Sequence, residues 1–82
     1  MSKLIGEAIK VHQDKDSKIT AFIWRKRLYG VLETIDWWRE PSEWWNGEPV
    51  RLYFRVNAKN SSTGIYELCQ LGKGWFLSRV LD

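Results

Sequence analysis

Two side chains in the sequence could take part in covalent or acid–base chemistry: the single histidine, His12, and the single cysteine, Cys69. A nucleophilic site needs a Ser, Cys or Thr beside a base, and a third group that orients the base. His12 lies in a charged segment, and Cys69 lies within an apolar strand pattern, where a free cysteine is typically a small core residue. These positions predict no catalytic residues, so we expect that the chain is not an enzyme.

Motifs for metals and phosphates are equally sparse. Structural zinc needs about four nitrogen or sulfur ligands, and one histidine with one cysteine supplies too few. The glycine–lysine–glycine run at 72–74 is typical of a hairpin turn and not of a phosphate-binding loop. Two pairs of carboxylates occur, Glu40 with Glu43 and Asp14 with Asp16. Nothing near them indicates the apolar pocket that raises a pKa for acid catalysis, and we expect no metal site and no cofactor.

Residues that bind through surface contacts are better represented. Arg51, Tyr53 and Arg55 alternate along a predicted strand and therefore share one face. An aromatic ring between two guanidinium groups suits a nucleic acid, because the ring stacks on bases and the cations pair with phosphates. The same trio also suits an ordinary solvent-facing strand, in which such side chains stabilise cross-strand pairs.

Positive charge lies mostly outside one acidic segment. Residues Glu33–Glu48 include five acids and one base, whereas the rest of the chain has twelve bases and five acids. The run Arg25, Lys26 and Arg27 is the densest basic stretch and is predicted to form the tip of a hairpin. A nucleic acid would be attracted to the basic part and repelled by the acidic segment. The alternative is that these are scattered, solvated charges.

Four of the six tryptophans form two adjacent pairs, Trp37-Trp38 and Trp44-Trp45. Two prolines and an Asn-Gly step oppose a continuous element over Trp37–Pro49, so we predict a long structured loop with one helical turn. Because neighbours in an extended chain face opposite sides, one member of each pair should be partly exposed. The pairs either close the open end of the sheet as core residues or present an aromatic patch to a protein, with Trp38, Trp44 and Trp45 as candidates.

The remaining segments predict short strands joined by turns. The expected strands are Ile5–Val11, Ile19–Trp24, Leu28–Ile35, Val50–Asn57, Ile65–Leu71 and Trp75–Leu81. The expected turns and loops are His12–Ser17, 25–27, 37–49, Ala58–Gly64 and 72–74. We expect an all-β fold with about six short antiparallel strands, the last three of them a meander, forming either a curled sheet or a small SH3-like barrel with a Trp-rich loop.

The size and composition indicate a single small domain over residues 1–82. Twelve aromatic residues are enough to build a core without disulfides. One cysteine permits no intrachain disulfide and fits a reducing compartment. We identify neither a signal peptide nor an apolar stretch of the roughly 20 residues needed to span a membrane. These features predict a cytoplasmic protein with no membrane partner.

A series of short motifs runs from Phe22 onward. They are Phe22-x-Trp24-Arg25, Tyr29-x-Val31-Leu32, Trp37 with Arg39, Trp44-Trp45-x-Gly47, Arg51-x-Tyr53-Phe54-Arg55-Val56, Tyr66-Glu67-Leu68 and Gly74-Trp75-Phe76-Leu77. In their order and spacing they resemble a small bacterial domain family with no assigned activity. The second half is also similar to the C-terminal segment of ImuB, a catalytically inactive relative of Y-family polymerases. The chain departs from the ImuB pattern at Leu52, where that segment has an acid.

The resemblance implies an accessory domain of translesion or repair polymerases that contacts DNA or proteins of the polymerase complex. We therefore expect a non-catalytic binding module associated with nucleic acid. Its expected contacts are Arg25, Lys26, Arg27, Arg51, Tyr53 and Arg55. The alternative is a protein-interaction module that uses the Trp37–Trp45 loop as an aromatic anchor.

Overall fold

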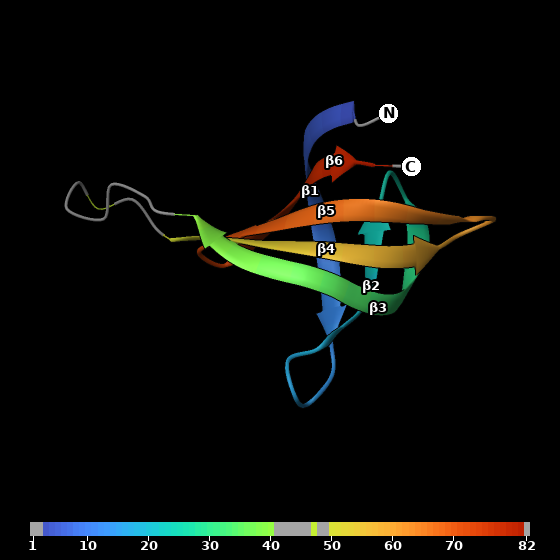
Figure 1. Ribbon diagram of the computed structural model, residues 1–82, viewed down its shortest axis with the longest axis horizontal. Helices are drawn as coiled ribbons and strands as arrows, with labels where there is room; N and C mark the ends of the chain where they lie inside the picture. Colours follow the sequence, from blue (N-terminus) through green and yellow to red (C-terminus); the bar gives the residue numbers. More distant parts are fainter. Residues whose placement is uncertain (1–2, 41–46, 48–49, 82) are drawn as a thin grey trace.

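In the computed structural model, six antiparallel strands close into a barrel (Figure 1). The structure describes residues 3–40, 47 and 50–81. The strands are β1 Lys3–Gln13, β2 Ile19–Trp24, β3 Arg27–Glu40, β4 Arg51–Lys59, β5 Thr63–Leu71 and β6 Gly74–Val80. Each strand pairs with the next in the chain, and β6 pairs with β1. The all-β prediction is confirmed, and of the two predicted forms the closed barrel, consistent with a small SH3-like barrel, is the one observed.

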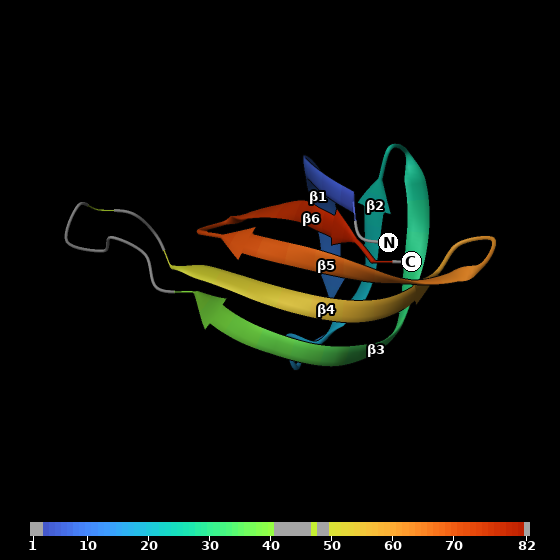
Figure 2. The same cartoon turned by 45° about the horizontal axis from the view of Figure 1, so that its top comes forward.

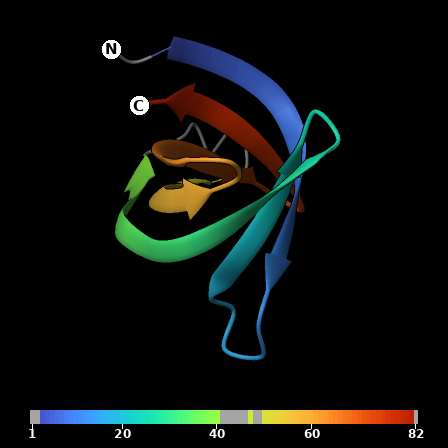
Figure 3. The same ribbon diagram turned by 90° about the vertical axis from the view of Figure 1, so that its right-hand side faces the viewer.

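Strand β1 closes the barrel by pairing along both of its edges. Its second half pairs with β2, and the stretch Lys3–Ile9 pairs with β6. The ladder with β6 shifts register between Leu4 and Glu7, where Gly6 has a φ of 69°. A glycine at positive φ is typical of a β-bulge, which bends a strand sharply. Figure 3 shows the resulting arch of β1 beside β6.

Aromatic rings fill much of the barrel interior. Phe22 is fully buried and stacks on Tyr29 with ring centroids 5.0 Å apart, while Tyr66 meets both rings edge-on. Offset stacks and edge-to-face contacts are the favourable geometries for aromatic pairs. The buried core cluster is completed by aliphatic residues from four strands: Ile19, Val56, Ala58, Leu68 and Leu77. The interior therefore relies on aromatic packing, as the composition predicted.

Strand β3 is longer than the sequence indicated. The predicted loop was to begin at Trp37, but β3 continues to Glu40, with Trp37 opposite Phe54 and Trp38 opposite Tyr53 on β4. Two register shifts, between Val31 and Glu33 and between Thr34 and Asp36, bend β3 so that it follows β4 (Figure 2). These shifts interrupt the simple alternation from which the prediction was made. The rest of the predicted loop, including Trp44, Trp45 and the helical turn, lies outside the described residues.

Two predicted loops are shorter than expected. Strands β4 and β5 extend through Lys59 and from Thr63, so the predicted Ala58–Gly64 loop shrinks to residues 60–62. Strand β1 runs to Gln13, which shortens the predicted turn that began at His12. In both hairpins the ladder continues until side chains fix the turn: Asn60 donates to the Leu28 carbonyl, and Asp14 accepts from the Lys18 amide. Within the described ranges, no helix is long and apolar enough to cross a membrane.

Leu68 and Leu28 give a matched test of the barrel core. Leu68 is fully buried, whereas Leu28 is 58% exposed. We expect Leu68→Ala to lower the free energy of unfolding by about 2–5 kcal/mol through a cavity, and Leu28→Ala to change it by less than about 0.5 kcal/mol. Urea unfolding followed by tryptophan fluorescence measures both. Equal losses in the two variants would contradict the assigned core.

Candidate functional site: an aromatic face and a basic tip

The outer side of β3–β6 brings aromatic and polar side chains together. Along β4, Phe54 and Val56 pack inward, so Arg51, Tyr53 and Arg55 face outward together, as the alternation predicted. The register places Trp38 and Cys69 on either side of Tyr53, and Phe76 next to Cys69. We call this surface the aromatic face. It consists of Trp38, Arg51, Tyr53, Arg55, Glu67, Cys69, Phe76 and Ser78.

Trp38 and Tyr53 form a parallel stack at the centre of the aromatic face. Their ring centroids are 5.5 Å apart with 10° between the planes. The guanidinium carbon of Arg55 lies 5.2 Å from the centroid of the Trp38 ring, which is within cation–π range. All three side chains are partly buried. The stack therefore presents a pre-ordered surface in place of freely rotating side chains.

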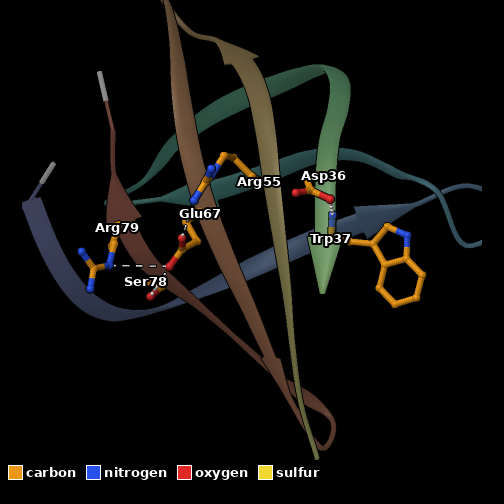
Figure 4. Close-up of polar contacts among 6 residues, drawn as sticks. All are labelled: Asp36, Trp37, Arg55, Glu67, Ser78 and Arg79. Carbon is orange, nitrogen blue, oxygen red and sulfur yellow. Dashed lines mark hydrogen bonds and ion pairs between the residues drawn. The ribbon is translucent and has the colours of Figure 1, made fainter. Parts of the chain in front are cut away.

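A buried carboxylate holds Arg55 in this position (Figure 4). Glu67 is only 6% exposed although it faces outward. Its carboxylate accepts a hydrogen bond of 3.1 Å from the Ser78 hydroxyl and pairs with Arg55 Nη2 at 3.5 Å and Arg79 Nε at 3.7 Å. A buried charge persists only when it is paired in this way. Arg55, predicted to contact phosphate, thus already has an anionic partner.

A cavity of about 260 Å³ opens beside the stack. It is lined by Gly6, Arg51, Tyr53, Cys69, Leu71, Phe76 and Ser78. Burial raises the pKa of the Cys69 thiol, which disfavours the thiolate that a nucleophilic cysteine requires. Burial is also the main cause that raises the pKa of the Tyr53 phenol. The cavity therefore offers uncharged hydrogen-bonding groups and aromatic walls, with one guanidinium, that of Arg51, at its edge.

Acidic residues of β3 face the arginines of this surface. The register places Asp36 opposite Arg55 and Glu40 opposite Arg51, and both acids are exposed. Opposite charges directly across a ladder stabilise each other and reduce the field around the pair. The aromatic face is therefore close to neutral, which weakens its attraction for a nucleic acid.

The second group of predicted residues forms the tip of the β2–β3 hairpin. Arg25 and Lys26 occupy the turn with φ values of 52° and 65°, a conformation that two-residue hairpin turns usually fill with Asn-Gly. Non-glycine residues in this region cost on the order of 1 kcal/mol each. Arg27 starts β3 opposite Trp24. We call these three cations, with Lys10 of β1, the basic tip.

Glu7 holds Arg25 of the basic tip in place. Its carboxylate accepts bonds from Arg25 Nε at 3.1 Å and Arg25 Nη2 at 2.7 Å, and a bond of 2.9 Å from the indole nitrogen of Trp24. Arg25 also lies over the Trp24 ring, 4.7 Å from its centroid. The Arg25 hydrogen bonds, and then that of Trp24, lower the pKa of Glu7 to about 2.

The aromatic face and the basic tip lie at opposite ends of β3. Gly30, near the tip, pairs with Lys59, whereas Glu40 at the other end pairs with Arg51. The structure thus separates the six residues predicted to contact nucleic acid into two sets, Arg25 to Arg27 and Arg51 to Arg55. They do not form one continuous surface.

Over residues 1–82 the chain matches the family described as "Domain of unknown function (DUF6504)". The chain belongs to this family. No curated protein and no solved structure matches it.

Among the described residues of this DUF6504 domain, the exposed tryptophan is Trp37, which was not among the predicted site residues. Trp37 is 62% exposed, whereas its neighbour Trp38 is partly buried on the opposite side of β3. Figure 4 shows the Trp37 indole pointing away from the Glu67 cluster. Trp37 lines a second cavity, of about 240 Å³, with Leu52 and Phe54. Neither member of this pair belongs to the buried core. Alternation along the strand correctly predicted that Trp37 and Trp38 lie on opposite sides of β3. Which of the two is exposed depends on the pairing of β3 with β4.

Sequence reasoning also missed Glu67 and Phe76 of the aromatic face. An acid inside the otherwise apolar run Tyr66–Leu71 was the available signal for Glu67, because a charge in such a strand needs a buried partner.

Among the described residues of the DUF6504 domain, no three His, Cys, Asp or Glu side chains gather as metal ligands. His12 is exposed at the end of β1 and does not line the cavity that contains Cys69.

The Glu7 clamp gives the DUF6504 domain a defined pH dependence. Folding lowers the pKa of Glu7 from 4.5 to about 2, so the clamp contributes to stability above pH 4.5 and is lost as pH falls towards about 2. We expect the Glu7 carboxyl carbon to titrate near pH 2 by NMR, and Glu7→Gln to flatten stability across this acid range. Glu33→Gln, which changes an exposed acid on β3, should keep the slope. A Glu7 titration near pH 4.5 would show that the clamp is not formed.

Proposed function

We propose that this domain is a non-catalytic binding module that holds an extended segment of a partner protein on the aromatic face. The observation that carries the proposal is the 260 Å³ cavity beside the Trp38–Tyr53 stack. Tyr53 and Phe76 provide walls for one apolar side chain of the partner. Arg51, exposed at the cavity edge, is placed to bind a carboxylate or a carbonyl oxygen next to that side chain.

The residue types of the aromatic face favour a protein partner. Trp, Tyr and Arg concentrate the binding energy of protein interfaces, above all where they are packed before the partner arrives. Here the stack and the Glu67 ion pairs already restrict Trp38, Tyr53 and Arg55. Binding therefore orders few additional side chains, and less conformational entropy is lost.

A nucleic acid is the weaker fit to this face. Asp36 and Glu40 lie one strand away from the arginines and repel phosphates. Tyr53 and Arg55 also pack on the Trp38 ring, which leaves less of that ring for stacking with a base. Both features favour a protein segment over a nucleic acid as the partner of this face.

The resemblance to the C-terminal segment of ImuB suggests the setting for this partner. Its Arg-x-Tyr motif corresponds here to Arg51-x-Tyr53, and both residues line the cavity. We accordingly propose a cytoplasmic accessory role in DNA-damage tolerance, with the partner segment drawn from a translesion or repair polymerase or a protein bound to it.

A displayed peptide library tests the proposal. The library tiles bacterial translesion polymerases and their accessory proteins together with random 12-residue segments, and the folded domain selects from it. We expect the selected peptides to shift the NMR signals of Trp38, Tyr53, Cys69 and Phe76. Arg51→Glu should weaken their binding at least tenfold, because it reverses the charge at the cavity edge.

Lys15→Glu is the matched control, since it makes the same charge change in the exposed β1–β2 turn. It should bind the selected peptides as the parent does, and circular dichroism should show both variants folded. Failure to enrich any peptide, or enriched peptides that bind away from the aromatic face, would refute the proposed function.

A further inference from the structure

We propose that the basic tip is a second binding surface, separate from the aromatic face, and that it takes the phosphodiester backbone of a nucleic acid. Lys10, Arg25 and Lys26 line a shallow cavity of about 540 Å³ with Ala8, Ile9 and Ile23. This site thus combines apolar side chains with two lysines and with Arg25, whose guanidinium also pairs with Glu7. Phosphate oxygens are the anions that such clustered Lys and Arg side chains bind most generally.

The charge around this cavity is one-sided. The stretch from residue 17 to residue 32 contains four bases and no acid. The nearby carboxylate of Glu7 is already bound by Arg25 and Trp24. Lys26 and Arg27 are exposed, and their charges face no acid of their own hairpin. In this respect the basic tip differs from the aromatic face, where each of the arginines on β4 has an acid opposite.

A strip of small residues extends the basic tip across the barrel. The ladders align His12, Ala21, Gly30 and Lys59 on β1, β2, β3 and β4. Adjacent strands lie about 4.8 Å apart, so the two outer residues are separated by roughly 14 Å along the sheet. Because Ala21 and Gly30 have small side chains or none, a nucleic-acid backbone could approach the sheet closely between the two outer residues. Lys59 thus adds a cation on the strand beyond β3, and positive charge spread over several strands matches a chain of repeated phosphates better than a single anion.

The turn conformation supports a binding role for the cations. Arg25 and Lys26 keep positive φ angles that glycine or asparagine would adopt with less strain. Glu7 and Trp24 hold Arg25 in place despite that strain. Backbone strain that the surrounding structure maintains concentrates at functional sites. The turn thereby places Arg25 and Lys26 next to each other at the apex, with the Lys26 side chain exposed to contact phosphates.

Fluorescence anisotropy with labelled 20-nucleotide single strands and duplexes tests this inference. We expect binding at low salt, with a log–log salt slope of about −2 to −4, because roughly three or four phosphates would be contacted. The double variant Lys26→Glu/Arg27→Glu should bind at least tenfold more weakly. Lys15→Glu/Lys73→Glu, which makes the same charge change in two other exposed turns, should bind as the parent does.

Further arms separate the alternatives. The nucleic-acid assignment would be overturned if poly-glutamate displaced the labelled oligonucleotide as effectively as unlabelled DNA does. It would also be overturned if the two double variants lost the same amount of DNA affinity, or if the parent domain showed no binding near 10 μM. Vesicles of anionic phospholipid that displace the DNA at equal phosphate concentration would assign the surface to lipid headgroups instead. Arg51→Glu should leave DNA binding unchanged while it removes peptide binding, so the two proposals can fail independently.

Lys26→Gly separates structural from binding effects. Glycine relieves the positive φ at this position, so the variant should unfold at a higher urea concentration. If Lys26 contacts phosphate, the same variant should bind the oligonucleotide several-fold more weakly. A variant that is more stable and binds DNA as well as the parent would show that Lys26 is only a turn residue.

Discussion

The whole structure depends on the bend of β1 at Gly6. Because β1 pairs with both β2 and β6, it must turn across the barrel, and the shifted register around a glycine of positive φ provides that turn. A Cβ at this position would meet no atom within 4 Å, so the requirement is for the backbone conformation and not for space. Gly6 also lines the cavity of the aromatic face, and the next residue, Glu7, clamps the basic tip. Closure of the barrel and the shape of both surfaces therefore rest on the same short segment.

Local patterns predicted the parts of this fold that depend on local physics. The bounds of β2 and the two faces of β4 followed from β-branched and aromatic residues and from alternation. The end of β3 did not follow, because its two register shifts are set by the pairing with β4, which a reading of β3 alone does not contain. Likewise, Glu67 is held by Arg55 and by Ser78 from β6. Such a cluster exists only once three strands lie side by side.

The sequence shows where acidic and basic residues are concentrated, but it does not show which acids lie opposite which bases in the folded sheet. The acidic segment does lie next to the arginines of β4, and the ladder places Asp36 and Glu40 directly opposite them. This converts what looked like a basic strand face into a nearly neutral one. On the β2–β3 hairpin Arg25 is paired with Glu7, but no acid lies opposite Lys26 or Arg27 within the hairpin, so the charges of these two residues remain available. A single nucleic-acid surface predicted from residue types thus divides into two surfaces of different chemistry.

The separation of the two surfaces has a consequence for binding. A closed barrel has no free edge that would let the strands slide or splay, so the aromatic face and the basic tip keep a fixed relation at the two ends of β3. A partner protein held on the aromatic face would bring nearby nucleic acid to a high effective concentration at the basic tip, and each contact could be weak on its own. Salt screens the phosphate contacts but not the aromatic contacts. The partner protein would therefore determine where the domain is located, and the basic tip would determine how the domain is oriented on the nucleic acid. A rigid scaffold with one neutral and one cationic end is the arrangement that such a division of roles requires.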